Sequence, residues 1–424
     1  MKKRPRRFVG TVLKPGLSVW MKILSCAAFV CAALSISSVP TWAADNSQQE
    51  ASPTTPPLLM PAMAGPLVAN PKPTTFDLGP LGNWYITGVV SGLGLWQDNV
   101  APGDSSTLAD LDNAQVFIQK TEGLFQFYVQ AGAYSLPDLG LPYIKTSKAI
   151  DAFYGPLPQA FVKLAPTDNF SISAGKLPTL IGAEYTFSFE NMNVERGLLW
   201  NQENAVNNGV QLNYTTGPLA LAFSWNDGFY SDRLSWVWGS ATYTVDSANT
   251  ISVVAGFNTT RTSISTTATP LFQNNEQIYN LIYTHTSGPW TLQPYFQYTF
   301  VPRIPDIGAL HHAATYGGAL LLKYTFDSDA NVGGVSLAGF SLPLRLEYIA
   351  STGSVANGAP NLLYGPGSNA WSVTLTPTYQ YKILFTRAEF SFVEATATTP
   401  GLAFGPGGTN TTQARLLLEA GILF

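Results

Sequence analysis

Acidic side chains are concentrated in one short stretch of this sequence, where they could act on cations. Only 11% of the chain is charged. Residues 178–204 nevertheless contain five charged side chains, namely Glu184, Glu190, Glu195, Arg196 and Glu203. Carboxylates around a narrow passage of low dielectric constant attract cations strongly, whereas the same residues in a loop surrounded by water do not. The elements that hold this stretch therefore decide what it does.

No other pattern predicts catalysis or a bound metal. The three histidines, His285, His311 and His312, have no carboxylate or cysteine at the spacing of a ligand set. No G-x-S-x-G nucleophile motif occurs. Residues 327–334, "DSDANVGG", resemble the start of a calcium loop, but the first glycine comes one position late and the twelfth position is Ala338 instead of glutamate. We therefore expect a turn there, and neither enzymatic activity nor a cofactor.

The amino-terminal residues predict a secretory signal peptide over residues 1–43. A basic stretch ends at Lys22, an apolar stretch follows, and "PTWAAD" offers a cleavage site after Ala43. Translation could begin at Met1 or Met21, and an anchoring helix is the alternative interpretation. Both cysteines lie in this segment, so we expect no disulfide in the mature chain. Seven of the 22 basic residues and none of the 26 acidic ones also lie there, which leaves a mature net charge of −11 and argues against nucleic-acid binding.

Two further regions follow the signal peptide. Residues 44–75 are rich in Pro, Ser, Thr and Gln without a usable period, so we expect a flexible tether. Residues 76–424 alternate between apolar and polar side chains. In residues 290–300, for example, Leu292 and Phe296 share one parity, while Gln and Thr occupy the other. This period of two is typical of strands with one apolar and one wet face.

The sequence contains about sixteen such strands, with no apolar run beyond residue 40 that reaches the roughly 18 residues of a spanning helix. Tight and long connections alternate between them. This alternation predicts an all-β, transmembrane antiparallel up-and-down barrel of about 16 strands (roughly 14–18), with short periplasmic turns and long extracellular loops. The expected strands lie near 83–97, 113–120, 124–134, 158–165, 169–177, 205–214, 217–226, 234–245, 249–258, 276–285, 289–300, 313–326, 337–350, 369–379, 381–393 and 412–424.

A barrel divides the side chains of each strand between a lipid face and a lumen face. Aromatic residues on the lipid parity gather at both ends of the expected strands, as in two interfacial girdles. Arg and Glu alternate at 345/347 and 387/389. These side chains either form structural ion pairs or produce a transverse electric field across the pore. The charges expected to face the lumen are Lys163, Lys323, Arg345, Glu347, Arg387, Glu389, Arg415 and Glu419.

A barrel also gives residues 178–204 a specific role, because they form the long loop after the fifth expected strand. We expect this loop to fold into the lumen and to build the pore constriction, with its net negative charge favouring cations. A solvated outer loop is the alternative. If the loop constricts the pore, replacing Glu190 and Glu195 with Gln should reduce cation preference.

Two short motifs lie within residues 171–230. The first, G-K-x-x-T-x-x-G-x-E, and the second, G-V-x-x-x-Y, are formed by Gly175, Lys176, Thr179, Gly182 and Glu184, and by Gly209, Val210 and Tyr214. Together with the overall layout, they resemble the OmpL-like beta-barrel porin family of Gram-negative outer membranes. The resemblance implies barrel architecture and an outer-membrane location. It supplies no catalytic residues and names no solute.

The sequence and the resemblance together predict an outer-membrane porin, a passive water-filled channel for small hydrophilic solutes. A non-conducting barrel that acts as a scaffold or binds partners through its long loops is the alternative. The expected partners are outer-membrane lipids and small hydrophilic solutes, and assembly as a homotrimer stays open. The resemblance further implies that the barrel-assembly machinery recognises a terminal aromatic strand, here residues 414–424 with Phe424 as the assembly signal.

Overall fold

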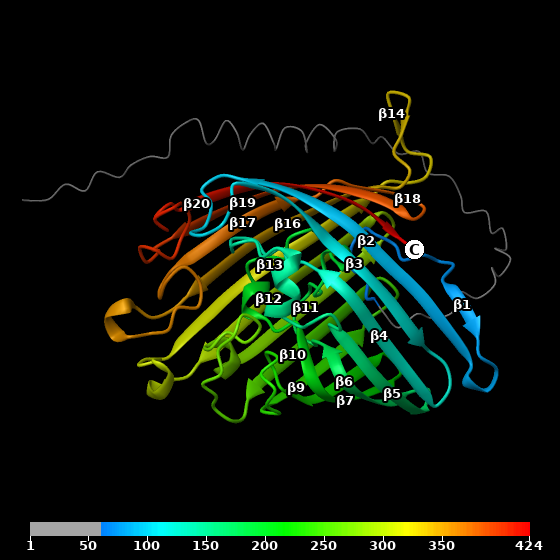
Figure 1. Ribbon diagram of the computed structural model, residues 1–424, viewed down its shortest axis with the longest axis horizontal. Coiled ribbons are helices and arrows are strands. Elements are labelled where there is room, and N and C mark those ends of the chain that lie inside the picture. The colour runs from blue at the N-terminus through cyan, green and yellow to red at the C-terminus, as the bar shows by residue number, and fades with distance from the viewer. Residues whose placement is uncertain (1–60) are drawn as a thin grey trace, which may run out of the picture. The chain divides into compact units, whose positions relative to one another are not determined.

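Alternating apolar and polar side chains form long antiparallel strands throughout residues 61–424, the part of the chain that the computed structural model describes (Figure 1). The expected signal peptide, 1–43, and residues 44–60 of the expected tether lie outside this part. None of the helices within residues 61–424 is long and apolar enough to cross a membrane.

The strands close into a sixteen-stranded barrel. Each strand pairs with the next, and β20 (Thr412–Leu423) pairs with β2 (Asn83–Gln97) from Val89↔Leu423 to Gln97↔Arg415. β17 (Asn369–Leu375) and β18 (Thr378–Tyr381) are two halves of one strand, since both pair with the same two neighbours. Pro377 lies at the break between them, where it cannot donate a ladder hydrogen bond. Closure leaves no long unpaired edge, as a sheet surrounded by lipid requires.

The remaining elements complete the barrel and its connections. The other barrel strands are β3 (Thr107–Lys120), β4 (Phe125–Tyr134), β5 (Gln159–Thr167), β6 (Phe170–Pro178), β7 (Val206–Thr216), β8 (Leu219–Asn226), β9 (Trp236–Thr244), β10 (Asn249–Asn258), β11 (Gln277–Ser287), β12 (Trp290–Val301), β13 (Ala313–Thr325), β16 (Phe340–Ser351) and β19 (Leu384–Thr396). The elements that are not strands of the wall are β1 (Thr74–Asp77), β14 (Asn331–Val332), β15 (Val335–Ser336), α2 (Thr146–Ala152), η1 (Gly79–Leu81), η2 (Ser188–Glu190), η3 (Trp200–Gln202), η4 (Gln273–Asn275), η5 (Pro305–Ile307) and η6 (Val355–Asn357).

The expected strand ranges agree with these bounds to within three residues except at β3. This strand begins at Thr107 instead of near residue 113. The cause is a bulge, because the β2–β3 register shifts between Ser91 and Gly92 and leaves Asp112 without a partner on β2. One extra residue reverses the inward and outward alternation. The period of two is therefore broken at Asp112, and this break is why the predicted strand begins too late.

Tight and long connections gather at opposite ends of the barrel (Figure 1). Two-residue turns join β7 to β8 and β11 to β12, and they begin with Gly217 (φ 54°) and Gly288 (φ 53°). Two-residue hairpin loops need this left-handed backbone, which glycine adopts at little cost. One connection at the tight-turn end departs from the pattern, since residues 326–339 form a projecting hairpin of β14 and β15.

The outer face is apolar and the interior is filled. Trp225, Phe296 and Leu418 point outward and are about half exposed or more. Most inward-facing residues of the long-loop half are buried, both polar and apolar, because the connections at this end fold back into the barrel. The core of this protein thus lies inside the barrel.

Candidate functional site inside the barrel

The connection between β6 and β7, residues 179–205, enters the barrel instead of projecting from its rim. We call it the inner loop. Every residue from Thr186 to Trp200 is buried. Phe187 and Phe189 pack in an apolar cluster with side chains of the barrel wall, among them Phe117. Two charged side chains of the inner loop, Glu184 and Glu195, form ion pairs with arginines of β16 and β20.

Arg345 on β16 joins the inner loop to the wall. Its Nη1 donates hydrogen bonds to Oε1 of Glu184 at 2.5 Å and to the carbonyl oxygen of Glu195 at 2.6 Å. Its Nε lies 3.1 Å from a carboxylate oxygen of Glu347. Glu347 also accepts a hydrogen bond from the amide of Leu198. Removing charges from water is costly, and these mutual contacts compensate for that cost.

β19 holds the inner loop with one charge of each sign. Arg387 donates to Glu419 on β20 at 2.7 Å and to the carbonyl oxygen of Ser188 at 3.0 Å. Glu389 accepts a hydrogen bond of 2.5 Å from the amide of Val194. The neighbours Arg387 and Glu389 therefore do not pair with each other, whereas Arg345 and Glu347 do.

Arg415 on β20 makes the third connection. Its Nη1 donates to Glu195 at 2.6 Å and to the carbonyl oxygen of Asp138 at 2.9 Å, while its Nε donates to Gln97 at 2.9 Å. Arg196 of the inner loop donates to the Asp138 carboxylate at 2.8 Å. The inner loop is thus fixed to the wall and also to the connection between β4 and β5.

Glu190 has no arginine or lysine partner among the ion pairs of residues 61–424. Its carboxylate accepts a hydrogen bond of 3.0 Å from the amide of Phe187 and closes the η2 turn. Burial raises the pKa of Glu190 to about 8, although the hydrogen bond from Phe187 and the charge of Arg196 act in the opposite direction. Glu190 is therefore mostly neutral at pH 7.

Glu203, at the end of the inner loop, and Glu276, just before β11, are the least compensated carboxylates of the interior. Neither accepts a hydrogen bond from any residue between 61 and 424, and their exposed fractions are 8% and 1%. The Glu203 carboxylate lies against Gly182, where a Cβ would overlap it. Burial raises the pKa of both groups, and the negative charge of Glu203 raises that of Glu276 further.

The closed sixteen-stranded barrel, with charged groups facing its lumen, can now be compared with known proteins. The family described as "Putative beta-barrel porin-2, OmpL-like" matches residues 83–424. The chain belongs to this family. No protein with a curated description matches the sequence. The expected family and the expected fold are therefore both confirmed.

Solved structures with the same fold are also outer-membrane barrels of this kind. The outer membrane channel DcaP of Acinetobacter baumannii has a TM-score of 0.54 at 10% identity and covers 81% of this chain and 97% of its own. OmpF of Salmonella typhi has a TM-score of 0.52 at 12% identity and covers 81% and 98%. The OmpT outer membrane protein of Vibrio cholerae has a TM-score of 0.52 at 11% identity and covers 81% and 97%. Identities this low show the shared fold alone.

The porin-family barrel has a wetter inner surface toward its tight turns. Lys163 on β5 and Lys323 on β13 are half-buried there. Lys323 donates to the carbonyl oxygen of Gly65, whereas Lys163 has no ion pair within residues 61–424. The uncharged polar residues that are half-buried on this inner surface include Gln211, Asn213, Thr242, Ser252, Thr284 and Gln293.

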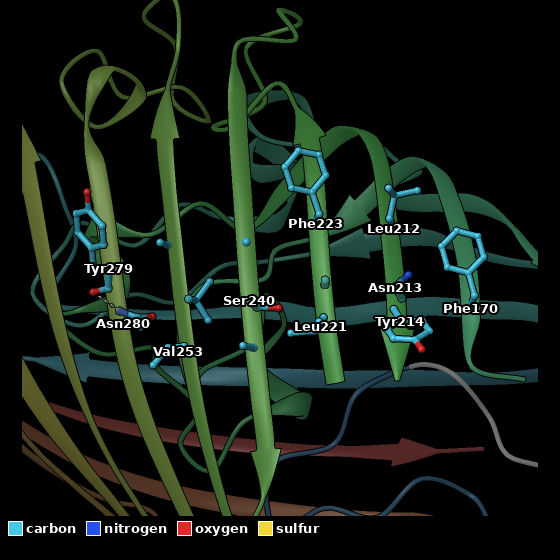
Figure 2. Close-up of a pocket in the computed structure, with 15 residues that line it drawn as sticks. Phe170, Leu212, Asn213, Tyr214, Leu221, Phe223, Ser240, Val253, Tyr279 and Asn280 are labelled. Carbon is cyan, nitrogen blue, oxygen red and sulfur yellow. Dashed lines mark hydrogen bonds between the residues drawn. The ribbon is translucent and has the colours of Figure 1, made fainter. Parts of the chain in front are cut away.

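A groove of about 760 Å³ crosses β6 to β11 on the outer face of the barrel (Figure 2). Figure 2 shows Phe170, Leu212 and Phe223 around it, and the small residues Gly239 and Ala241 line it. Its lining is apolar and faces away from the lumen, so it belongs to the lipid-facing surface of the porin-family barrel.

Four acidic residues of the interior were not identified from the sequence. One is Asp227, which begins the connection between β8 and β9, is buried and accepts a hydrogen bond from the amide of Asn208. Asp112 lies at the β3 bulge and accepts hydrogen bonds from Ser135 and Ser188. Asp138 and Glu276 lie in long connections, where sequence gives no inward or outward parity. Only Glu276 could have been identified from the sequence, because it directly precedes β11 and has the same parity as the inward-facing residues of that strand. Within residues 61–424, no group of three or more His, Cys, Asp or Glu side chains is arranged to hold a metal ion.

Proposed function

We propose that this barrel is a passive channel that lets small hydrophilic solutes cross the outer membrane, with a preference for cations. The observation that carries the proposal is the inner surface near the tight turns, where uncharged Gln, Asn, Ser and Thr side chains are partly exposed although they face the lumen. Such a lining suits water and polar solutes. Membership of a porin family favours a channel over an enzyme.

The proposed preference for cations rests on the charge balance of the interior. Ten carboxyl groups and four guanidinium groups are buried within residues 61–424. The arginines are paired with Asp138, Glu184, Glu195, Glu347 and Glu419. The pore constriction proposed from the sequence therefore divides into two groups. Glu184, Glu190, Glu195 and Arg196 hold the inner loop in place through hydrogen bonds and ion pairs. Glu203 and Glu276 have no such partner and act on a passing cation once they are ionised.

Recording from planar bilayers tests the proposal. We expect stepwise openings and, under a KCl gradient, a reversal potential on the cation-selective side. The double variant Glu203→Gln/Glu276→Gln should lower the cation preference, and the difference from the unmodified protein should grow as pH rises and these carboxyl groups ionise. Asp168→Asn, an exposed carboxylate in the β5–β6 turn, is the matched control.

A folded but silent barrel would overturn the proposal. The buried state of the inner loop gives the alternative function a specific basis, because residues 186–200 fill part of the lumen. A barrel whose lumen stays filled would act as a scaffold or bind partners through its long loops. Migration on gels with and without heating distinguishes folded from unfolded protein, so silence caused by misfolding can be recognised.

A further inference from the structure

The segment before β1 lies inside the barrel and touches the inner loop. The amides of Ala64 and Gly65 both donate to the carbonyl oxygen of Glu190, at 2.9 and 3.0 Å. The proline-rich composition of these residues predicted a flexible tether without contact to the barrel. The contacts place residues 61–70 in the lumen, between the tight-turn end and η2 of the inner loop. We call residues 61–70 the inner strap.

Side chains of the barrel wall bind the backbone of the inner strap. Gln380 on β18 accepts a hydrogen bond from the amide of Val68 at 2.8 Å and donates to its carbonyl oxygen at 2.9 Å. Lys323 on β13 donates to the carbonyl oxygen of Gly65 at 3.2 Å. Both strands flank β16, so these contacts fix the inner strap against one part of the wall.

One side chain anchors the inner strap in the apolar interior. Leu67 is 1% exposed and lies in a cluster with Val89 and Phe117, which face inward from β2 and β3. The neighbouring Val68 is 64% exposed. Close contact with the inner loop also fixes a residue type, since a Cβ on Gly65 would overlap the carbonyl oxygen of Asn191.

The inner strap is attached without being part of the sheet. Pro61, Pro66, Pro71 and Pro73 interrupt residues 61–73, and proline cannot donate to a strand ladder. The first ladder pairing is that of β1 with β2, which begins at Thr74. Two backbone hydrogen bonds to Glu190, a few side-chain contacts and one leucine therefore hold the segment, whereas the strands of the wall are joined by ladders of hydrogen bonds.

We propose that the inner strap is a removable plug. It occupies the tight-turn half of the lumen and holds the inner loop in its constricting position through the backbone carbonyl oxygen of Glu190. Leaving its seat widens the water-filled path and frees the tip of the inner loop. This gating role rests on the proposed channel function and adds to it a conformational step located in residues 61–70.

Variants of the inner strap test the role in bilayer recordings. Leu67→Ser removes the apolar anchor, and Gly65→Val removes the close approach to Asn191. Because the conductance of a wet path follows its free cross-section, both should raise single-channel conductance by about twofold or more. Val68→Ser changes an exposed side chain of the same segment and should leave conductance unchanged. Equal conductance in all four proteins would overturn the gating role.

Cysteine labelling follows the position of the inner strap independently of conductance. In protein freed of Cys26 and Cys31, a cysteine at position 67 should be protected from a maleimide and one at position 68 should react. Rapid labelling at 67 in the otherwise unmodified protein would overturn the seated position. If Gly65→Val frees position 67 but conductance stays the same, the segment is seated without gating. If every folded variant is silent while position 67 is protected, the proposed channel function is wrong, and the gating role is wrong with it.

Discussion

Arg415, on the strand that closes the barrel, donates a hydrogen bond of 2.6 Å to Glu195, which lies 220 residues earlier in the middle of the inner loop. Both side chains are almost completely buried, at 2% and 1% exposure. The closing strand therefore holds the element that narrows the lumen, in addition to completing the wall. Arg345 and Glu389 make equivalent contacts from β16 and β19.

Loss of either member of this pair should destabilise the barrel strongly. Arg415→Gln or Glu195→Gln leaves the partner charge buried without compensation, which costs about 3–5 kcal/mol. Urea unfolding in lipid vesicles, followed by tryptophan fluorescence, measures the change. The double variant should lose less than the sum of the two single variants, because neither charge is then left alone. Additive losses would show that the two side chains are not coupled.

A glycine of the inner loop provides a steric test of its fit against the wall. A Cβ on Gly197 would overlap the carboxylate of Glu347, which accepts the amide hydrogen bond of Leu198. Overpacking of this kind costs about 1–3 kcal/mol, so Gly197→Ala should lower the urea midpoint. Gly407→Ala is the matched control, since the nearest atom there is 3.7 Å away. An unchanged midpoint for Gly197→Ala would mean that the inner loop does not pack against Glu347.

Most of the wall could be predicted from the sequence, because its physics is local. A strand in lipid must place apolar and polar side chains on alternate faces, so residues such as Leu292 and Phe296 reveal their direction by parity alone. The inward direction of Arg345, Glu347, Arg387 and Arg415 follows from the same rule. Closure between β2 and β20 follows from the need to pair every backbone group.

The interior could be predicted only in part, because its contacts join residues far apart in the chain. The density of charge in residues 178–204 indicated that the loop was special. It did not indicate that Arg345 would bind Glu184 or that Glu389 would bind the amide of Val194, since no local period encodes such pairings. The position of the inner strap was missed for the same reason, as its proline-rich composition is also that of a free linker.

The contribution of Glu190 to the stability of the barrel should depend on pH. Its pKa is raised from 4.5 to about 8, so the folded state binds a proton that the unfolded state releases. The barrel therefore loses stability as pH rises from about 4.5 to about 8. Glu190→Gln removes this dependence. Compared with the unmodified protein, the variant should therefore be more stable at pH 9 than at pH 6, and urea unfolding at the two pH values would measure the difference.

Ion selectivity should follow the same titration. Because Glu190 is neutral at pH 6, Glu190→Gln should leave the reversal potential there unchanged and reduce cation preference only at pH 9. This refines the expectation from sequence, which assumed a charged Glu190. An equal effect at both pH values would mean that Glu190 is ionised throughout and that its burial does not control its charge.

Phe424 combines a structural contact with the proposed role of assembly signal, and the two can be separated. Its amide donates to the carbonyl oxygen of Gly88 at 2.9 Å, and its carbonyl oxygen accepts from the amide of Gly88 at 2.7 Å. Its ring lies over Gly88, where a Cβ would overlap it. Gly88→Val should displace the ring while leaving the final residue in place. Deleting Phe424 removes the residue itself.

If the barrel-assembly machinery recognises Phe424, the two variants should have opposite effects on membrane insertion and on stability. The deletion should reduce the amount of folded barrel in the outer membrane of cells, with little effect on the urea midpoint of protein refolded in vesicles. Gly88→Val should lower that midpoint but still be inserted. A deletion variant inserted as well as the unmodified protein would leave Phe424 with its contact to Gly88 alone, since the hydrogen bonds along the rest of β20 are sufficient to close the barrel.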